Sequence, residues 1–275
     1  MNKNYRVEIA NKTLEIIKNG FYEVDGKKID IEKELKSSVE NTVTIAPEDW
    51  ESILGIRIDN KHNTEISIKN CSTIEAIFQE KERKIGVLNF ASAKNPGGGF
   101  LGGASAQEER LARSSSLYES QIKDKKMYDF NRSQSSFLYS DYMIYSPDVL
   151  FWNDDNGNYF EQPLVADVIT SLAPNKGAML QHNRKDEIEN IYKVFKRRMD
   201  EVLAIAAKTK IETLILGAWG CGVFRNEPKE VAQLFREIIS EKYSGVFQKI
   251  VFAVYDTSEK KSNFKFFEAV LKNNQ

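Results

Sequence analysis

Apolar residues recur along this chain with helical spacing in some segments and in short continuous runs, typical of buried strands, in others. Near the N-terminus, the spacing predicts an amphipathic helix that ends at Gly20. Its inward-facing positions are Ile9, Ala10, Thr13, Leu14 and Ile17. The following segment, to about residue 62, is mixed and polar. We therefore interpret residues 1–62 as an N-terminal helical accretion on the rest of the chain.

From residue 63 onward, short runs rich in Val, Ile and Leu alternate with helical patterns. The predicted strands are Ile66–Lys69, Ile85–Phe90, Tyr142–Tyr145, Val165–Thr170, Thr213–Gly217 and Ile250–Tyr255. The predicted helices start near Thr73, capped by Ser72, and cover Asp186–Ala207, Pro228–Ser240 and Phe264–Leu271. This alternation predicts an α/β fold with a mixed, largely parallel sheet covered on both faces. Because no repeat or linker divides the chain, we expect residues 1–275 to form one unit with its core at 63–275.

Composition narrows the function classes. The 275 residues carry a formal net charge of -1, so no overall positive field attracts nucleic acid, and we expect no general nucleic-acid binding. The two cysteines, Cys71 and Cys221, form no disulfide framework. The sequence has no cluster of His and Cys residues that would suggest a metal site. No apolar run approaches the length of a membrane span. We expect a cytoplasmic protein without a membrane partner.

Two glycine-rich segments follow predicted strands directly. Gly97–Glu109 reads GGGFLGGASAQEE, and Gly217–Pro228 reads GAWGCGVFRNEP. Ligands of open α/β sheets bind beyond the carboxyl ends of the strands, and glycine lets a ligand approach main-chain N–H groups closely. Neither segment has the spacing of a Walker A loop or of a dinucleotide-binding loop. The pair therefore predicts a phosphorylated ligand held from two sides.

Glu108 and Glu109 add candidate acid chemistry to the first segment. A structural interpretation competes, because Ser105 and Glu108 have the spacing of a capping box and Glu109 with Arg113 that of an i,i+4 ion pair. The glutamates can thus simply begin a helix. The conjunction of a glycine triplet, paired acids and a second glycine loop at strand ends favours a functional site. Adjacent acids at one site also favour a neutral, proton-donating carboxyl group.

Three glycines followed after a short spacer by Gln-Glu-Glu resemble the signature of poly(ADP-ribose) glycohydrolases. The longer strings that resemble the microbial branch of this family are NFASAKNPGGGFLGGASAQEERLARSSSLY, IYSPDVLFW, VITSLAPN and LILGAWGCGVFRNEP. The resemblance extends from the first helix to FAVYD at Phe252–Asp256. It implies a macrodomain-like, three-layer αβα fold that binds ADP-ribose in a cleft at the strand ends.

Carried over by position, the resemblance implies unequal roles for the two glutamates. Glu109 would be the catalytic acid, Glu108 would bind the adjacent ribose hydroxyls, and Gln107 would hold their loop. Phe224 would pack against the terminal ribose. The other implied contacts, to the diphosphate and the distal ribose, are Gly97, Gly98, Gly99, Gly220, Cys221, Gly222 and Val223.

One position departs from the animal enzymes of the family. They have Phe-Ala-Asn before the glycines, whereas this chain has Ser92 after Phe90-Ala91. The polar side chain that contacts the ribose is then Asn89, Ser92 or Asn95. We include Asn95 in the predicted site because it lies nearest to the glycine triplet.

The implied reaction is hydrolysis of the ribose–ribose O-glycosidic bond of poly(ADP-ribose), with ADP-ribose as product and with no metal or cofactor. Neighbouring residues cannot easily flank a sugar on opposite faces, so one acid would protonate the leaving hydroxyl and then activate water. Other functions stay open. The chain could remove single ADP-ribose units from modified protein or nucleic acid, bind ADP-ribose without catalysis, or bind another nucleotide metabolite.

Overall fold

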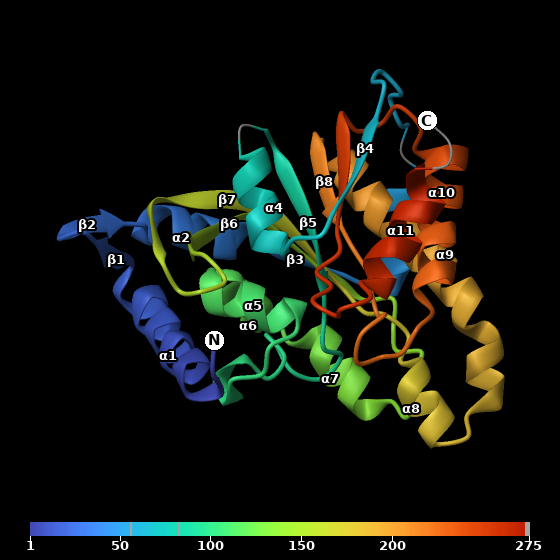
Figure 1. The fold of residues 1–275 in the computed structure, drawn as a ribbon, viewed down its shortest axis with the longest axis horizontal. Coiled ribbons are helices and arrows are strands. Elements are labelled where there is room, and N and C mark those ends of the chain that lie inside the picture. Colours follow the sequence, from blue (N-terminus) through green and yellow to red (C-terminus); the bar gives the residue numbers. More distant parts are fainter. Residues whose placement is uncertain (56, 82, 273–275) are drawn as a thin grey trace.

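A seven-stranded sheet forms the centre of the computed structural model, which describes residues 1–55, 57–81 and 83–272 (Figure 1). Its strand order is β3-β6-β7-β5-β8-β9-β4. The strands are β3 (Val43–Ile45), β4 (Glu65–Lys69), β5 (Ile85–Phe90), β6 (Met143–Asn153), β7 (Tyr159–Ser171), β8 (Thr213–Leu216) and β9 (Lys249–Ala253). From β7 to β4 every pairing is parallel, whereas β6 pairs antiparallel with both β3 and β7. The predicted mixed, largely parallel sheet is confirmed.

Helices cover both faces of this sheet (Figure 1). They are α1 (Lys3–Asn19), α2 (Glu32–Asn41), α3 (Trp50–Leu54), α4 (Thr73–Glu80), α5 (Gln107–Ser114), α6 (Leu117–Lys123), α7 (Lys126–Ser133), α8 (Lys176–Gln181), α9 (Lys185–Lys208), α10 (Pro228–Lys242) and α11 (Ser262–Lys272). Neighbouring strand residues point to opposite faces. Accordingly, Leu88 packs in a core with α9, α10 and α11, while Val87 packs in another with α4, α5 and α6. The fold is therefore the expected three-layer αβα arrangement.

The N-terminal segment is more than a helical accretion. Helix α1 ends at Gly20, as predicted, and Gly20 takes a left-handed conformation with φ +72°. The hairpin β1 (Phe21–Val24) and β2 (Lys27–Asp30) follows, and β3 then joins the edge of the central sheet beside β6. These short strands carry too few residues to show a period of two, so the sequence pattern did not distinguish them from polar loops.

The core elements agree with the sequence pattern more closely. Ser72 caps α4, its hydroxyl accepting a hydrogen bond from the Glu75 amide at 3.0 Å. The long helices α9, α10 and α11 lie where they were predicted. Strands β6 and β7 extend well beyond the predicted segments and meet at the tight turn 154–158, while the helix that the two glutamates begin ends at Ser114 and α6 starts separately at Leu117. None of the described helices is both long and apolar enough to cross a membrane.

Candidate active site

A cleft of about 610 Å³ opens at the carboxyl ends of β5, β8 and β9. Parallel strands bring these ends to one edge of the sheet, so the loops that follow them meet there. The cleft is lined by the loop after β5, the loop after β8, the first turns of α4 and α5, and the segment after β9. Both glycine-rich segments singled out in the sequence therefore contribute to one cavity.

The start of α5 differs from the predicted capping box. Its N-cap is Ala106 rather than Ser105, and Oε2 of Glu109 accepts a hydrogen bond from the Ala106 amide at 3.0 Å. Arg113 does not pair with Glu109. It donates instead to the carbonyl oxygen of Ala104 at 2.5 Å. Glu109 therefore both caps the helix and lines the cleft.

Glu108 points into the protein, where its carboxyl group is surrounded by donors. The residue is only 3% exposed. Oε2 accepts a hydrogen bond from the Ser92 amide at 2.6 Å, and Oε1 accepts from the side-chain amides of Gln121 at 2.9 Å and Asn89 at 3.2 Å. Burial raises the pKa of Glu108 to about 8, although these three donors oppose the shift. The environment that favours a neutral carboxyl group thus surrounds Glu108.

Glu109 is oriented differently, because successive residues of a helix point about 100° apart. It is half-buried and lines the cleft. Oε1 accepts a hydrogen bond from the Gly99 amide at 3.0 Å, and Oε2 accepts the Ala106 bond described above. The carboxylate is therefore fixed at both oxygens by the backbone of the first glycine segment and presented to the cleft.

Gln107 joins the beginning of α5 to the end of β5. Its Oε1 accepts a hydrogen bond from the Phe90 amide at 2.9 Å, and its Nε2 donates to the Leu88 carbonyl oxygen at 2.9 Å and to Thr73 Oγ1 at 3.2 Å. Gln107 thus bonds to the backbone of β5 as a neighbouring strand would. Gln107 thereby sets the position from which Glu108 and Glu109 extend.

The glycine triplet uses its amides inside the protein. The amide of Gly97 donates to Gln121 Oε1 at 2.9 Å, that of Gly98 to the Asn95 carbonyl oxygen at 2.9 Å, and that of Gly99 to Glu109. Gly98 has φ +60°, and a Cβ there would overlap the Glu109 carboxylate. Gly98 and Gly99 line the cleft, whereas Gly97 lies beneath it against Phe100. The glycine triplet therefore leaves space for the Glu109 carboxylate.

The loop after β8 has the opposite property. Within the described residues, no hydrogen bond uses the amides of Gly220, Gly222, Val223 and Phe224, and all four residues line the cleft. The loop is held from behind by Asn226, which donates through Nδ2 to the carbonyl oxygens of Pro174 at 2.8 Å and Gly220 at 3.0 Å. Free N–H groups gathered on one loop form an anion-binding surface.

Cys221 differs from the other predicted residues of this loop. Its amide donates to the Ala218 carbonyl oxygen at 3.1 Å, and the residue is not part of the cleft wall. Burial raises the pKa of its thiol well above the usual value, which disfavours a reactive thiolate. Phe224 lies in the wall and contacts Tyr139, with ring centroids 6.1 Å apart.

The candidates for the ribose contact separate by position. Ser92 and Asn95 line the cleft, whereas Asn89 is fully buried and hydrogen-bonds to Glu108 from below. Gln121, a second donor to Glu108, had no signal in the sequence because it reaches the site from α6. The wall after β9 was also missed. Its residues, Tyr255, Thr257 and Asn263, could have been suggested by the strand-end rule alone.

No metal site accompanies this arrangement. In residues 1–55, 57–81 and 83–272, no group of at least three His, Cys, Asp or Glu side chains is placed to hold a metal ion. Within the described residues, the cleft offers the half-buried carboxylate of Glu109, the buried carboxyl group of Glu108, the ion pair of Arg110 with Asp155 and a loop of amide donors.

Comparison with known proteins agrees with this geometry. Residues 10–154 match the catalytic domain of microbial-type PARG. A crystal structure of poly(ADP-ribose) glycohydrolase from Thermomonospora curvata is 36% identical, with a TM-score of 0.92 over 97% of this chain and 99% of that one. The same enzyme bound to the inhibitor ADP-HPD is 37% identical over the same shares, with a TM-score of 0.89.

A second bacterial enzyme gives the same result. Poly(ADP-ribose) glycohydrolase from Deinococcus radiodurans, in complex with ADP-ribose, is 36% identical, with a TM-score of 0.84 over 92% of this chain and 100% of that one. No curated protein sequence matched the chain. The family match covers the first glycine-rich loop and α5, and the structural similarity extends over 97% of the chain. The chain therefore belongs to the microbial-type poly(ADP-ribose) glycohydrolase family.

Proposed function

We propose that the chain, as a poly(ADP-ribose) glycohydrolase, hydrolyses the ribose–ribose O-glycosidic bond of poly(ADP-ribose), with Glu109 as general acid and Glu108 orienting the distal ribose. ADP-ribose is the product. The relatives crystallised with ADP-ribose and with ADP-HPD support this substrate class. The two free cysteines, Cys71 and Cys221, are consistent with a reducing, cytoplasmic location.

The observation that carries the proposal is the position of the Glu109 carboxylate. The Gly99 and Ala106 amides fix it in the wall of the cleft that also holds the free amides of the second loop. A ligand whose diphosphate binds those amides presents its distal ribose toward α5. Cleavage of a glycosidic bond passes through an oxocarbenium-like state, and it needs a proton donor at the leaving oxygen. Glu109 is the acidic side chain so placed.

Glu108 has a supporting role in this mechanism. Asn89, Ser92 and Gln121 hold its carboxyl group, and the residue lines the cleft next to Glu109. Adjacent glutamates cannot act from opposite faces of a sugar, so the proposed mechanism uses Glu109 twice. It first donates a proton to the ribose hydroxyl that leaves. It then accepts a proton from the water that attacks the anomeric carbon.

Replacing Glu109 by Gln tests the proposal. We expect release of ADP-ribose from polymer to fall by about 10²- to 10⁴-fold, the usual contribution of a general acid. Calorimetry should give an unchanged Kd for ADP-ribose, because Gln keeps the size of the side chain. Glu230→Gln, on the exposed first turn of α10, is the matched control and should change neither quantity.

Two results would contradict the assignment. Near-normal turnover by the Glu109→Gln variant would show that Glu109 is not the acid. Tight binding of ADP-ribose by the unmodified protein without any release from polymer would indicate a non-catalytic reader instead. Running the same assay on mono-ADP-ribosylated protein, with and without EDTA, separates a polymer-specific enzyme from a mono-ADP-ribosyl hydrolase and detects a metal requirement.

A further inference from the structure

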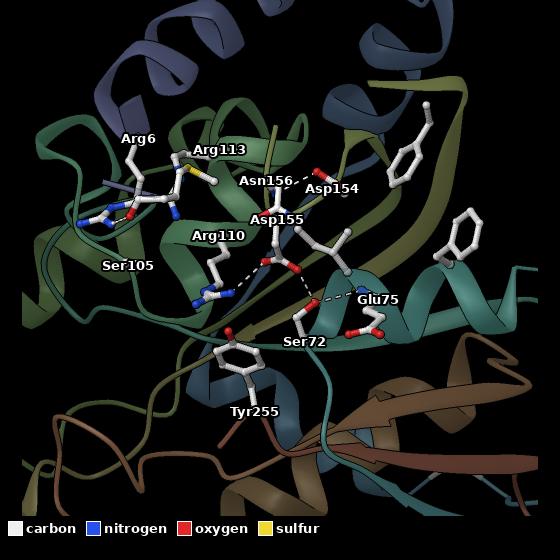
Figure 2. Close-up of a pocket in the computed structure, with 14 residues that line it drawn as sticks. Arg6, Ser72, Glu75, Ser105, Arg110, Arg113, Asp154, Asp155, Asn156 and Tyr255 are labelled. Atoms are coloured by element: carbon white, nitrogen blue, oxygen red, sulfur yellow. Dashed lines mark hydrogen bonds and ion pairs between the residues drawn. The ribbon is translucent and has the colours of Figure 1, made fainter. Parts of the chain in front are cut away.

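A second cavity, of about 700 Å³, adjoins the cleft beside α5 (Figure 2). The two cavities share part of their walls, including Ser105, Arg110 and Tyr255. Helices α1, α4 and α5 and the turn between β6 and β7 enclose it. The mechanism above uses no residue from its interior. We call it the arginine cavity, after Arg6, Arg110 and Arg113 on one of its sides.

Two of these arginines have no acidic partner. In the described part of the chain, Arg6 donates to the carbonyl oxygens of Gly103 and Met1, both at 2.7 Å, and Arg113 donates only to that of Ala104. Neither forms an ion pair with a carboxylate there. A guanidinium group has five N–H donors, so each keeps donors that no described group accepts. Figure 2 shows the two side chains next to each other at the wall of the arginine cavity.

Arg110 completes the positive side. It forms an ion pair with Asp155 at 3.2 Å and lies over the ring of Tyr255, 4.4 Å from the ring centroid (Figure 2). Arg113 is only 3% exposed, and its burial together with repulsion from Arg6 and Arg110 lowers its pKa to about 10. Arg110 is thus paired with a carboxylate, whereas Arg6 and Arg113 keep guanidinium donors that no described group accepts. An anion bound here could accept hydrogen bonds from both.

Part of the wall of the arginine cavity is aromatic. Phe78 and Phe160 stack with ring centroids 5.8 Å apart and an angle of 17° between their planes. Both line the cavity, and Phe78 is 48% exposed. Exposed aromatic side chains are the groups on which nucleic-acid bases stack.

Two further acidic residues line this cavity, and neither forms an ion pair with an arginine among the described residues. Asp154 is occupied within its own turn, where it accepts hydrogen bonds from the amides of Asn156 and Asn158 at 2.8 and 2.9 Å. Glu75 lies on the exposed first turn of α4, away from the arginines in Figure 2. Cationic and aromatic side chains therefore line one cavity.

An ADP-ribose unit has the matching parts, a diphosphate and an adenine. We propose that the arginine cavity binds the ADP-ribose unit adjacent in the polymer to the unit held in the cleft, its diphosphate on Arg6 and Arg113 and its adenine at Phe78 and Phe160. This inference rests on the proposed function, because it needs a polymeric substrate. The two cavities share wall residues, so one ligand can extend from the cleft into the arginine cavity. Such a site gives the enzyme a preference for polymer over a single ADP-ribose unit.

The test compares a labelled dimer of ADP-ribose with free ADP-ribose, in the Glu109→Gln background so that binding is measured apart from turnover. Only the dimer reaches both cavities. Adding Arg6→Gln should weaken dimer binding about tenfold and lower the slope of log affinity against log salt by about one. The Kd for ADP-ribose should not change. Arg184→Gln, an exposed arginine next to α9 and outside both cavities, is the matched control.

Two further variants separate ligand binding from a purely structural role of Arg6, which also bonds to the loop before α5. Arg6→Lys keeps the charge and should retain most of the dimer affinity. Phe78→Ala should weaken the dimer, and not ADP-ribose, by about fivefold or more, as loss of a stacking partner does.

Certain outcomes overturn the inference. These are an unchanged dimer affinity in Arg6→Gln, an equal loss of affinity for dimer and monomer, or an Arg6→Lys variant as weak as Arg6→Gln. Residual turnover in the Glu109→Gln background would count against the proposed acid alone, because the dimer affinities are measured independently of it.

Discussion

The two glycine-rich loops of the cleft look alike in sequence and differ in what their amides do. In the loop after β5, the amides of Gly97, Gly98 and Gly99 are all used by the protein itself. In the loop after β8, the amides of Gly220 and Gly222 have no acceptor among the described residues. In the first loop, glycine leaves space for a carboxylate. In the second loop, it leaves amide donors exposed where a ligand is expected to bind.

This difference predicts that substitutions in the two loops affect different properties of the enzyme. The first loop and α5 should govern the acid groups, and hence kcat and the pH dependence of folding. The second loop should govern ligand affinity. Three substitutions test the separation, in decreasing order of expected effect.

The largest effect is expected from Glu108→Gln on stability as a function of pH. Burial raises the pKa of Glu108 from 4.5 to about 8. A carboxyl group whose pKa is higher in the folded state stabilises the fold below its unfolded pKa, and this contribution is lost as the pH rises through about 8. The free energy of unfolding of wild type relative to the variant should fall by up to about 1.4 kcal/mol per pH unit across this window.

Denaturant titrations of both proteins between the two pKa values measure this slope. Glu201, which is also buried, is present in both proteins, so its own titration cancels in the difference. A difference that stays constant with pH would show that Glu108 is ionised in the folded protein throughout. Glu230→Gln, an exposed substitution, should give no pH-dependent difference.

Gly98→Ala should act on catalysis. The new Cβ would displace the Glu109 carboxylate, and the left-handed backbone at φ +60° adds strain. Misplacement of a catalytic group by about 1 Å costs about 10²-fold in rate. We expect kcat to fall by that factor, with a smaller change in the Kd for ADP-ribose. Gly102→Ala is the control in the same segment, because nothing lies within 4 Å of the added Cβ. Equal losses in both variants would argue against a specific role for Gly98.

Val223→Pro should act on binding alone. Val223 is the second residue of a turn closed by the Arg225 amide and the Gly222 carbonyl oxygen at 3.0 Å, a position that accepts proline. The substitution removes one free amide and keeps the turn. The Kd for ADP-ribose should rise about tenfold, as for loss of a hydrogen bond to a charged group, with kcat retained at saturating polymer. Val223→Ala keeps the amide and should bind normally. Unchanged affinity in Val223→Pro would mean that this amide does not hold the ligand.

Much of the fold follows from local pattern. Buried strands such as Ile85–Phe90 and the long amphipathic helices α9 and α10 have many apolar positions in register, so their periodicity is unambiguous. Strand β3 has three residues and owes its conformation to pairing with β6. The break between α5 and α6 likewise depends on the tertiary bridge of Ser115 to Phe151. Such elements are fixed by partners distant in sequence.

The functional site also combines features that are local in sequence with features that depend on packing. The pairing of glycines with Gln107, Glu108 and Glu109 is local, and the sequence identifies it. Which carboxyl group is buried depends on Gln121 of α6 and on Asn89 of β5, both of which donate to Glu108. Which amides are free depends on turn conformations that glycine content alone does not specify. The sequence therefore supports a choice of residues, whereas their division of labour is a property of packing.

The junction of Gln107 with β5 fixes more than a position. Because Gln107 binds the backbone of Leu88 and Phe90, it sets the rotational phase of α5 as well as its height above the sheet. Inserting one residue between this anchor and Glu108 would turn the two glutamates by about 100° about the helix axis. Glu108 would then take the direction that Glu109 has now, toward the cleft, and Glu109 would take that of Arg110, away from its bonds to the Gly99 and Ala106 amides. Insertions are thus tolerable in the loop before Gln107 but not after it, a limit on how this segment can vary in length.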